Sequence, residues 1–423
     1  MTTDNEYKIL ESCDALFPDV INFTKDMVRE YAVLHQEQGV LGIVEKHMQG
    51  LGLPTTRVPM DHHKLSAHPM YAPVEWDGDD KYNIVSALNS GAAGKSLVLN
   101  GHLDVVSAEP FDMWTRPPNE PWEKDGWLYG RGTGDMQSGV AAMIYAVHAI
   151  THAGFKIKSP LTIHTVVEEE CSGNGALACL QHGYDGDFVL IPEPFGPQIY
   201  AGQLGVLWFK LDVYGTPVHV LDTSAGENAI EKMMSLIPYL KELEAELNAK
   251  HRRPPYDQFD HPFNLNIGTF NGGNWASSVP AHAAMEARIG FPVGMPASAI
   301  MRLVSECIDK AAENLPAFKK QKPKLSFHGF RSEGHLVDLE NPGIQMLEEC
   351  HKSLTNEEAK HILSTCTTDL RAFQFHSNMT GTCYGPVAQR IHGVDECVDI
   401  ESIRHTLKTY ALFISRWCDI ETL

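Results

Sequence analysis

Three short runs of apolar or β-branched residues, each leading to a side chain that can bind a metal ion, constrain the fold of this chain most strongly. Residues 97–99 lead to His102, residues 161–167 lead to three consecutive glutamates, and residues 188–191 lead to Glu193. Short runs of apolar and β-branched residues are typical of buried parallel strands. Because open α/β sheets place their ligands at the carboxyl ends of the strands, we expect these side chains to meet at one edge of a sheet.

Asp104 follows His102 by two residues and lies on the same side of an extended chain. Its carboxylate could therefore reach back to a ring nitrogen of His102. Such a contact fixes the tautomer of a metal-bound imidazole and raises its basicity. The spacing predicts Asp104 as a partner of His102 within the same site.

A glycine-rich segment places Asp135 at the junction between a loop and a helix. Gly130, Gly132 and Gly134 permit a tight backbone path, and an apolar helical stretch over residues 140–150 follows. The start of a helix favours a carboxylate there. A nucleotide-binding loop is the alternative, but the acidic partner expected after a following strand is missing.

The three glutamates, Glu168 to Glu170, stand between a predicted strand and a Ser-Gly-Asn-Gly turn. Adjacent like charges at a strand end are costly unless a cation compensates them. Metal ions would do so and would leave one carboxylate free as a base. Each position taken alone also has an ordinary explanation: Glu168 to Glu170 as a solvated charge run, Asp135 as a helix cap, Glu193 as a turn residue and His392 as a loop histidine.

The motifs GHLDVV, GRGTGDMQSG, VVEEECSGNGA, IPEP and GPVAQRIHGVDE resemble those of the M20 family of metallohydrolases over nearly the whole chain. This family includes acetylornithine deacetylases, succinyl-diaminopimelate desuccinylases, aminoacylases and glutamate carboxypeptidases. The resemblance implies two divalent metal ions, with zinc expected and cobalt or manganese as alternatives. It also implies the following roles: one ion on His102 and Glu193, the other on Glu170 and His392, Asp135 between them, and Glu169 as general base and acid.

The resemblance extends to residues that would contact substrate. It implies that His219 reaches over the active site, often from the partner subunit, to stabilise the oxyanion, whereas an edge-strand histidine is the structural alternative. Ser277, Thr367 and Arg371 fall in segments that match substrate contacts. Two departures stand out, because Ser277 replaces an asparagine of many relatives and Arg288 lies earlier in its strand than their lid arginine. We expect Arg288 or Arg371 to bind a substrate carboxylate.

The order of predicted elements indicates two domains, as a chain of 423 residues leads one to expect. Alternating strand and helix signals, starting with a helix over residues 19–50, continue to about residue 197 and favour an α/β fold. An amphipathic helix near residues 400–417 ends the chain. Between these parts, the pattern is β-α-β-β-α-β, which is typical of the ferredoxin-like fold.

We therefore expect an α/β catalytic domain, with a mixed sheet and helices on both faces, from residues 1–205 and 331–423. Residues 206–330 are expected to form an inserted α+β ferredoxin-like lid, with a long helix over about residues 227–250. By the family resemblance, this lid would also hold two subunits together as a homodimer.

Composition excludes some partners. The formal charge of −20 and the lack of a basic stripe argue against nucleic acid. No apolar stretch approaches a membrane span, and the polar N-terminus has no signal-peptide design. Nine scattered cysteines are typical of reduced thiols, so we expect a cytoplasmic protein.

Within the family, glutamate at position 193 is typical of deacylases and carboxypeptidases, which predicts an N-acyl-amino-acid deacylase cleaving a non-peptide amide bond. A metallo-carboxypeptidase or dipeptidase is the alternative. So is an amidohydrolase acting on an aromatic or heterocyclic amine, whose pocket could be lined by Trp122, Trp127, Trp208 and Trp275. A catalytically silent protein of the same fold would be expected to lack Glu169 or a ligand, and all are present.

Overall fold

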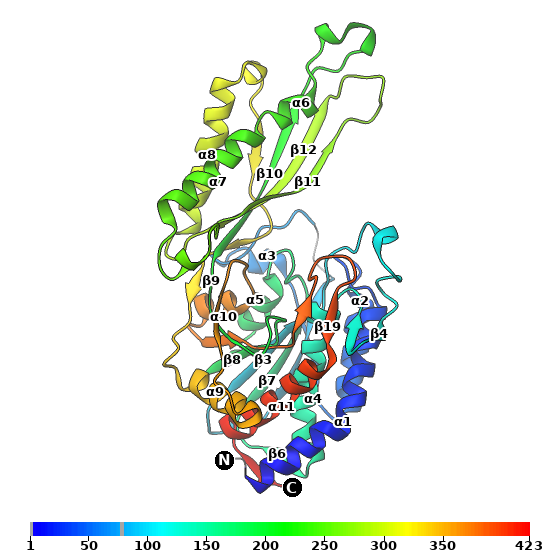
Figure 1. Ribbon diagram of the computed structural model, residues 1–423, viewed down its shortest axis with the longest axis vertical. Coiled ribbons are helices and arrows are strands. Elements are labelled where there is room, and N and C mark those ends of the chain that lie inside the picture. Colours follow the sequence, from blue (N-terminus) through cyan, green and yellow to red (C-terminus); the bar gives the residue numbers. More distant parts are fainter. Residues whose placement is uncertain (1–2, 77–79) are drawn as a thin grey trace.

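The computed structural model describes residues 3–76 and 80–423. Two hydrophobic cores organise the chain (Figure 1). The first uses side chains from residues 9–200 and 337–418, and the second uses side chains from residues 204–318. We call the parts built around them the large unit and the small unit.

A mixed six-stranded sheet forms the centre of the large unit. Its strands lie in the order β1 (Thr56–Pro59), β2 (Tyr82–Leu88), β7 (Leu161–Val166), β3 (Leu97–His102), β8 (Phe188–Ile191) and β17 (Thr380–Cys383). From β7 to β17 all neighbours are parallel, whereas β1 and β2 are antiparallel to their neighbours. The carboxyl ends of β7, β3 and β8 therefore share one edge.

Helices cover both faces of this sheet (Figure 1). On one face pack α1 (Asp4–Arg29), α4 (Ser138–His152) and α11 (Ile400–Trp417), and on the other α5 (Asn174–Gln181) and α10 (Leu370–His376). Adjacent residues of β3 face opposite sides of the sheet. Gly101 contacts α4, and Asn100 donates a hydrogen bond to Asp369 beside α10. Peripheral helices are α2 (Gln38–Gly50), α3 (His62–Leu65) and α9 (Pro342–Thr355).

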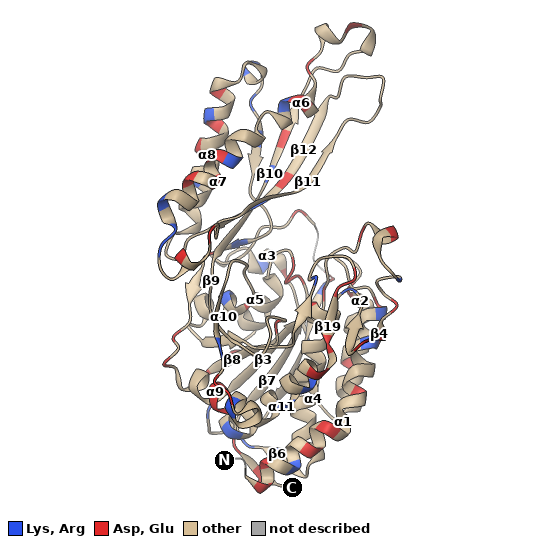
Figure 2. Cartoon of the chain, viewed as in Figure 1, with Lys and Arg blue, Asp and Glu red and all other residues tan. Residues whose placement is uncertain are grey.

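The small unit is an antiparallel sheet with helices on one face. Its strands lie in the order β11 (Leu265–Gly272), β12 (His282–Phe291), β10 (Gly205–Tyr214) and β13 (Lys324–Ser326), and β14 (Arg331–Ser332) also pairs with β10. The helices α6 (Ala229–Met234), α7 (Ile237–His251) and α8 (Ala297–Asn314) pack on one face of it. Charged residues of both signs lie along α7 and α8 (Figure 2).

The predicted fold class is confirmed, since the large unit is α/β with a mixed sheet and the small unit has the predicted β-α-β-β-α-β order. The domain limits at residues 205 and 330 stay predictions. Two predicted helices were wrong in extent. The first is two helices, because Tyr31 and His35 have positive φ between α1 and α2. The helix over 227–250 is broken between α6 and α7, where Pro238 occupies the first turn of α7 and cannot continue a preceding helix.

Smaller sheets complete the fold. They are β15 (His335–Leu336), β9 (Ile199–Gln203) and β16 (His361–Ser364); β18 (Ala388–Gln389), β19 (Cys397–Asp399), β5 (Trp127–Tyr129) and β4 (Trp122–Lys124); and β20 (Ile420–Thr422) with β6 (Phe155–Ile157). Among the helices of residues 3–76 and 80–423, none is both long and apolar enough to cross a membrane.

Candidate metal centre and active site

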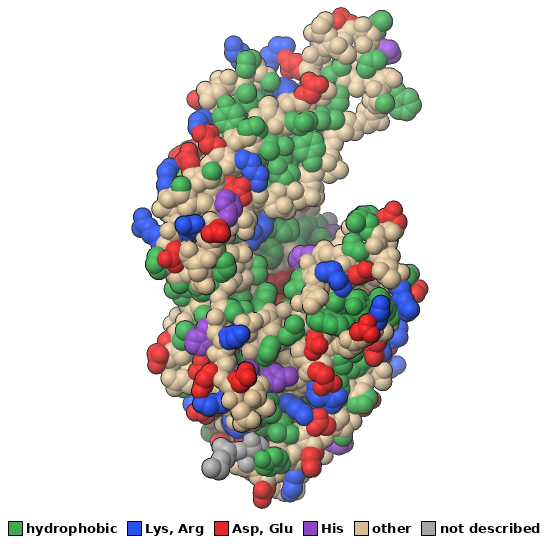
Figure 3. Space-filling model, viewed as in Figure 1, with side chains coloured by type: hydrophobic (Ala, Val, Ile, Leu, Met, Phe, Trp, Pro, Cys, Tyr) green, Lys and Arg blue, Asp and Glu red, His purple; other side chains and the backbone are tan. Residues whose placement is uncertain are grey.

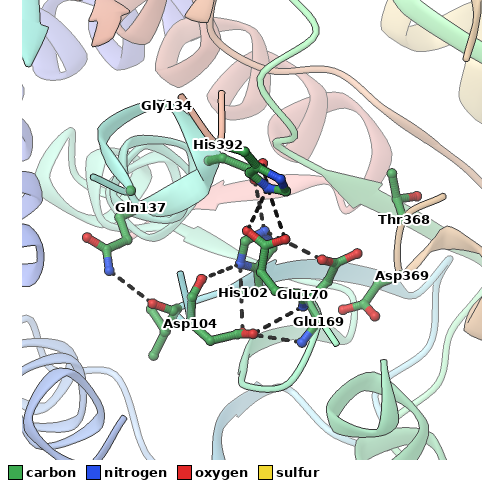
Figure 4. Close-up of polar contacts among 12 residues, drawn as sticks. His102, Asp104, Gly134, Gln137, Glu169, Glu170, Thr368, Asp369 and His392 are labelled. Atoms are coloured by element: carbon green, nitrogen blue, oxygen red, sulfur yellow. Dashed lines mark hydrogen bonds and ion pairs between the residues drawn. The ribbon is translucent and has the colours of Figure 1, made fainter. Parts of the chain in front are cut away.

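The predicted ligands arrive at one edge of the main sheet from five segments. His102 ends β3, Glu170 follows β7, and Glu193 lies two residues beyond β8. Asp135 comes from the loop before α4, and His392 from the loop between β18 and β19, with φ of 61°. Figure 4 shows His102, Glu170 and His392 directed toward one another.

Asp135 lies between the two histidines. Its Oδ1 is 3.0 Å from Nε2 of His102, and its Oδ2 is 3.4 Å from Nε2 of His392. The same nitrogen of His392 is 3.1 Å from Oε2 of Glu170. One donor atom each from His102, Asp135 and Glu170 lie within 4.8 Å of one another. Imidazole nitrogens and carboxylate oxygens are the donors that zinc accepts, so this group fits a divalent ion.

The electrostatics of the site also favour bound cations. Burial raises the pKa of Glu193 well above its usual range, and the negative charges of Asp135 and Glu170 raise it further. Burial likewise raises the pKa of Glu169. For Asp135, burial is outweighed by the hydrogen bonds with His102 and His392, which lower its pKa. The protein supplies too little positive charge near these carboxylates, and divalent ions would supply the remainder.

Asp104 supports two parts of the site. Its backbone oxygen is 2.9 Å from Nδ1 of His102, whereas its carboxylate is 3.8 Å from that nitrogen. The carboxylate instead accepts hydrogen bonds from the backbone N–H groups of Glu169, at 3.3 Å, and Glu170, at 3.1 Å. The ring is therefore oriented by a carbonyl rather than by the predicted carboxylate, because the turn after β7 presents two N–H groups to that carboxylate.

Sequence reasoning missed Glu396, which holds the loop that carries Asp135. Its Oε1 accepts hydrogen bonds from the backbone N–H groups of Gly132, Gly134 and Asp135 at 3.1, 2.9 and 3.0 Å, and its other oxygen pairs with Arg131. A Cβ at Gly134 would lie 3.2 Å from that oxygen, so glycine permits the close approach. The available signal was an acid four residues after His392 in the same motif.

Sequence reasoning also left the direction of Glu168 open. Its side chain is fully buried and points away from the metal ligands, toward Lys81 and Trp76. Burial alone would raise its pKa, but the nearby His62 and the charge of Lys81 lower the pKa to about 2. Two of the three consecutive glutamates are therefore left to serve the site.

A cavity of about 480 Å³ runs from Glu169, Glu170 and His392 to the sheet of the small unit. It belongs to the hollow between the two units in Figure 3. Three of its lining residues form a row across neighbouring strands, with Arg288 of β12 between Asn266 of β11 and Trp208 of β10. Phe330 stands edge-on to Trp208, with ring centroids 5.3 Å apart. The wall thus offers an amide, a guanidinium and an aromatic surface.

The structure separates the predicted substrate residues into three groups. Arg288 and Thr367 line the cavity. Arg371 does not line it, because its guanidinium is buried over the ring of Phe330, at 4.8 Å, and donates to the backbone oxygen of Ser172 at 2.5 Å. His219 and Ser277 are exposed, and the loops that carry them, residues 215–228 and 273–281, form the tip of the small unit that lies away from the large unit (Figure 1).

His219 is bridged to Ser278 at that tip. Of the four tryptophans considered for an aromatic pocket, Trp208 lines the cavity. Trp122 and Trp127 belong to the hairpin of β4 and β5, and Trp275 is exposed at the tip.

The donor atoms of His102, Asp135 and Glu170 converge as those of a divalent-metal site do. The sequence profile of Peptidase family M20/M25/M40 matches residues 98–416, and the chain belongs to this family, as its motifs indicated. Membership implies divalent metal ions, for which the group of His102, Asp135 and Glu170 is a candidate site. The protein is thus an M20 metallohydrolase acting on amide bonds.

Relatives with assigned activities differ in substrate. The chain is 27% identical over 359 residues to N-formyl-4-amino-5-aminomethyl-2-methylpyrimidine deformylase of Halalkalibacterium halodurans, covering 80% of this chain and 83% of that protein. It is 25% identical over 414 residues to succinyl-diaminopimelate desuccinylase of Gluconacetobacter diazotrophicus, covering 94% and 96%.

Solved structures share the fold at lower identity. The di-peptidase Dug1p from Saccharomyces cerevisiae superposes with a TM-score of 0.81 at 16% identity, over 99% of both chains. Human carnosine dipeptidase 1 gives a TM-score of 0.78 at 16% identity, over 98% of this chain and 99% of its own.

Proposed function

We propose that this enzyme is a deacylase that hydrolyses the amide bond of an N-acyl amino acid. The observation that carries the proposal is Arg288, a half-buried guanidinium in the cavity that begins at Glu169. One of its nitrogens donates to the backbone oxygen of Thr365 at 2.9 Å. Within the described residues it forms no ion pair with a carboxylate, so a substrate carboxylate would complete its contacts.

In this proposal, His102 and Glu193 would hold one divalent ion, Glu170 and His392 would hold the other, and Asp135 would contribute to holding the pair. Zinc is the proposed metal, since the set combines imidazole and carboxylate donors. When bound, the ions supply the Lewis acidity that polarises the scissile carbonyl and makes a water molecule acidic near neutral pH.

Glu169 is the proposed general base and acid. Its carboxylate takes a proton from water while the water oxygen bonds to the carbonyl carbon, and it later delivers that proton to the nitrogen as the carbon–nitrogen bond breaks. The products are a carboxylate and an amine. Burial raises the pKa of Glu169, which favours the protonated form that delivers the proton to the nitrogen in the second step.

His219 is proposed to act on the active site of a second subunit in a homodimer formed through the small unit. Its exposed position at the tip, away from the cavity of its own chain, supports this role. So do exposed apolar neighbours, since Leu221 is 90% exposed and Trp275 is 72% exposed. We also propose a reducing, cytoplasmic location, which the nine free cysteines support.

An amide of an aromatic or heterocyclic amine is the second candidate substrate. The wall formed by Trp208 and Phe330 favours it, because flat rings stack on such surfaces. The similarity to a pyrimidine deformylase points the same way.

Amine release from a panel of substrates tests these alternatives. The panel contains N-formyl, N-acetyl and N-succinyl amino acids, their methyl esters, dipeptides, and acylated aminomethyl heterocycles, with zinc, cobalt or manganese and a chelated control. We expect the largest kcat/KM for an N-acyl amino acid and a large loss on esterification. Faster turnover of dipeptides would move the enzyme to the peptidases, and faster turnover of uncharged heterocyclic amides would favour the second candidate.

A further inference from the structure

We propose that Glu168 is a positioning residue that directs Glu169 and Glu170 into the site while its own carboxylate is held behind the turn by Trp76 and Lys81. The proposal rests on the function above where it assigns Glu169 as the base and Glu170 as a metal ligand. It concerns a residue that touches neither substrate nor metal.

The carboxylate of Glu168 is bound on both oxygens. Oε1 accepts a hydrogen bond from Nε1 of Trp76 at 2.8 Å and forms an ion pair with Nζ of Lys81 at 3.1 Å. Nε2 of His62 lies 3.6 Å from the same oxygen. Oε2 accepts a hydrogen bond from Oγ of Ser172 at 2.8 Å. The side chain is 0% exposed. These contacts leave the carboxylate with fixed direction and no access to solvent.

The backbone at Glu168 needs such an anchor. Its φ is 64°, in the left-handed region that non-glycine residues rarely adopt. This conformation turns the chain after β7, and its carbonyl accepts the N–H groups of Ser172 and Gly173 at 3.1 and 2.6 Å. Residues held in this region persist where the surroundings fix them, and the clamp on the side chain supplies that constraint.

The opposite side of the same turn is held by Asp104, which accepts the N–H groups of Glu169 and Glu170. The turn is therefore fixed from both sides, by Asp104 toward the metal ligands and by Trp76 and Lys81 behind. If the rear contacts were lost, Glu168 could swing toward the same edge, where a further carboxylate would repel or compete with the two that serve the site.

The clamp is independent of the motif that carries the glutamates. Trp76 and Lys81 precede that motif by about 90 residues, and Lys81 is itself neutralised by Glu37, with Nζ to Oε1 at 2.7 Å. The segment that carries Trp76 is tied to the large unit as well, since Asn174 exchanges hydrogen bonds with both backbone groups of Ala72, at 3.1 and 2.9 Å. Lys81 and the segment that carries Trp76 are thus held by contacts other than those with Glu168.

Metal binding measured without substrate tests the proposal. Trp76→Phe removes the indole donor and keeps the ring, and Glu168→Gln removes the charge with little change of shape. Both variants leave Lys81 paired with Glu37, whereas Lys81→Met would bury unpaired carboxylates and could fail to fold. We expect the affinity for Zn²⁺, by competition with a chelator, to fall about tenfold or more, as for other groups that orient metal ligands.

The same variants should shift the visible absorption of the Co²⁺-substituted protein and lower kcat more than they raise KM. Matched controls are Trp417→Phe, which removes an indole bond to Ser96 O at 3.0 Å, and Glu244→Gln, a largely buried carboxylate of the small unit that accepts from Lys241. These should lower the melting temperature by a similar amount and leave metal affinity unchanged.

Unchanged Zn²⁺ affinity and Co²⁺ spectrum in both Glu168→Gln and Trp76→Phe, with only a lower melting temperature, would overturn the positioning role and leave Glu168 as a stability residue. Because affinity is measured without substrate, failure of the wild-type enzyme to cleave N-acyl amino acids would overturn the proposed function and leave this inference standing.

Discussion

The large unit and the small unit hold their polar residues in opposite ways. At the edge of the large sheet, His102 is 1% exposed and Glu193 is 4% exposed, and the carboxylates of Asp104, Asp135 and Glu396 each have two or more partners. In the small unit, most of edge strand β11 is exposed, and His219 and Ser277 lie in exposed loops. Chemistry needs groups fixed by many contacts, whereas recognition can use a surface that is completed by substrate or by a second subunit. Changes in the two units should therefore affect different steps.

The largest effect is expected from removing the metal ions. Chelation should abolish amide hydrolysis and lower the melting temperature, because the buried carboxylates would lose their compensating charge. Activity and melting temperature are measured before and after adding back Zn²⁺, Co²⁺ or Mn²⁺. Hydrolysis that persists in thoroughly chelated protein would contradict a metal-dependent mechanism.

Glu169→Gln tests the large unit by replacing one carboxylate oxygen of the proposed base with an amide nitrogen. We expect kcat to fall by roughly 10²- to 10⁴-fold, the usual contribution of a general base, while bound metal stays unchanged. Steady-state kinetics and metal analysis of the purified variant check both parts. A variant that keeps most of its turnover would exclude Glu169 as the base, and one that loses metal would make it a ligand.

His219→Ala tests the tip of the small unit. We expect kcat to fall by about 10²-fold, as when an oxyanion donor is removed, with little loss of metal. Mixing this variant with Glu169→Gln distinguishes the two arrangements. If His219 acts across a dimer, mixed dimers contain one complete site and activity partly recovers, whereas a histidine acting within its own chain gives no recovery. Unchanged kinetics in His219→Ala alone would make it a structural residue.

Two arginines provide a matched pair across the units. Arg288→Met should lower kcat/KM for an N-acyl amino acid by about 10-fold or more and reduce the preference for the free acid over its methyl ester. Arg371→Met should mainly lower stability and leave that preference intact, because Arg371 is buried against Phe330 and Ser172. Loss of ester discrimination in Arg371→Met, but not in Arg288→Met, would reverse the assignment.

The sequence predicted best what depends on neighbouring residues. Strands β3 and β8 and helix α11 lie where their apolar patterns placed them, and His102 and Glu193 stand at or just beyond strand ends. These predictions needed only the strand pattern and the rule that parallel strands share an edge. The motif resemblance then supplied the family.

What the sequence could not predict depends on partners that are distant along the chain. Nothing local tells which of three glutamates turns inward, because the answer lies in Lys81 and Trp76. The sequence predicted Arg371 as a substrate contact, but in the structure its guanidinium packs on Phe330 and donates to Ser172. Local propensity does not contain such tertiary contacts, and these decide whether a polar side chain is structural or faces a ligand.

The smallest expected effect is a difference between the two units in how their stability depends on pH. His164 in β7 is fully buried, and burial lowers its pKa to about 3. Folding keeps the ring neutral, whereas the unfolded ring, with a pKa of about 6.5, binds a proton. The unfolded state therefore gains protons as the pH falls below about 6.5, and this contribution to stability is lost progressively until about pH 3.

His164→Met removes that contribution and keeps a side chain of similar volume. For metal-free protein, the loss of unfolding free energy between pH 7 and pH 5 should be smaller in the variant than in the wild type by about 2 kcal/mol. Urea unfolding at both pH values measures it. His282→Gln, in the small unit, is the control, since His282 is exposed and pairs with Asp212 at 2.7 Å. An equal pH dependence in His164→Met and the wild type would mean that acid acts on the large unit through other groups, and the metal-binding edge would then be the first place to look.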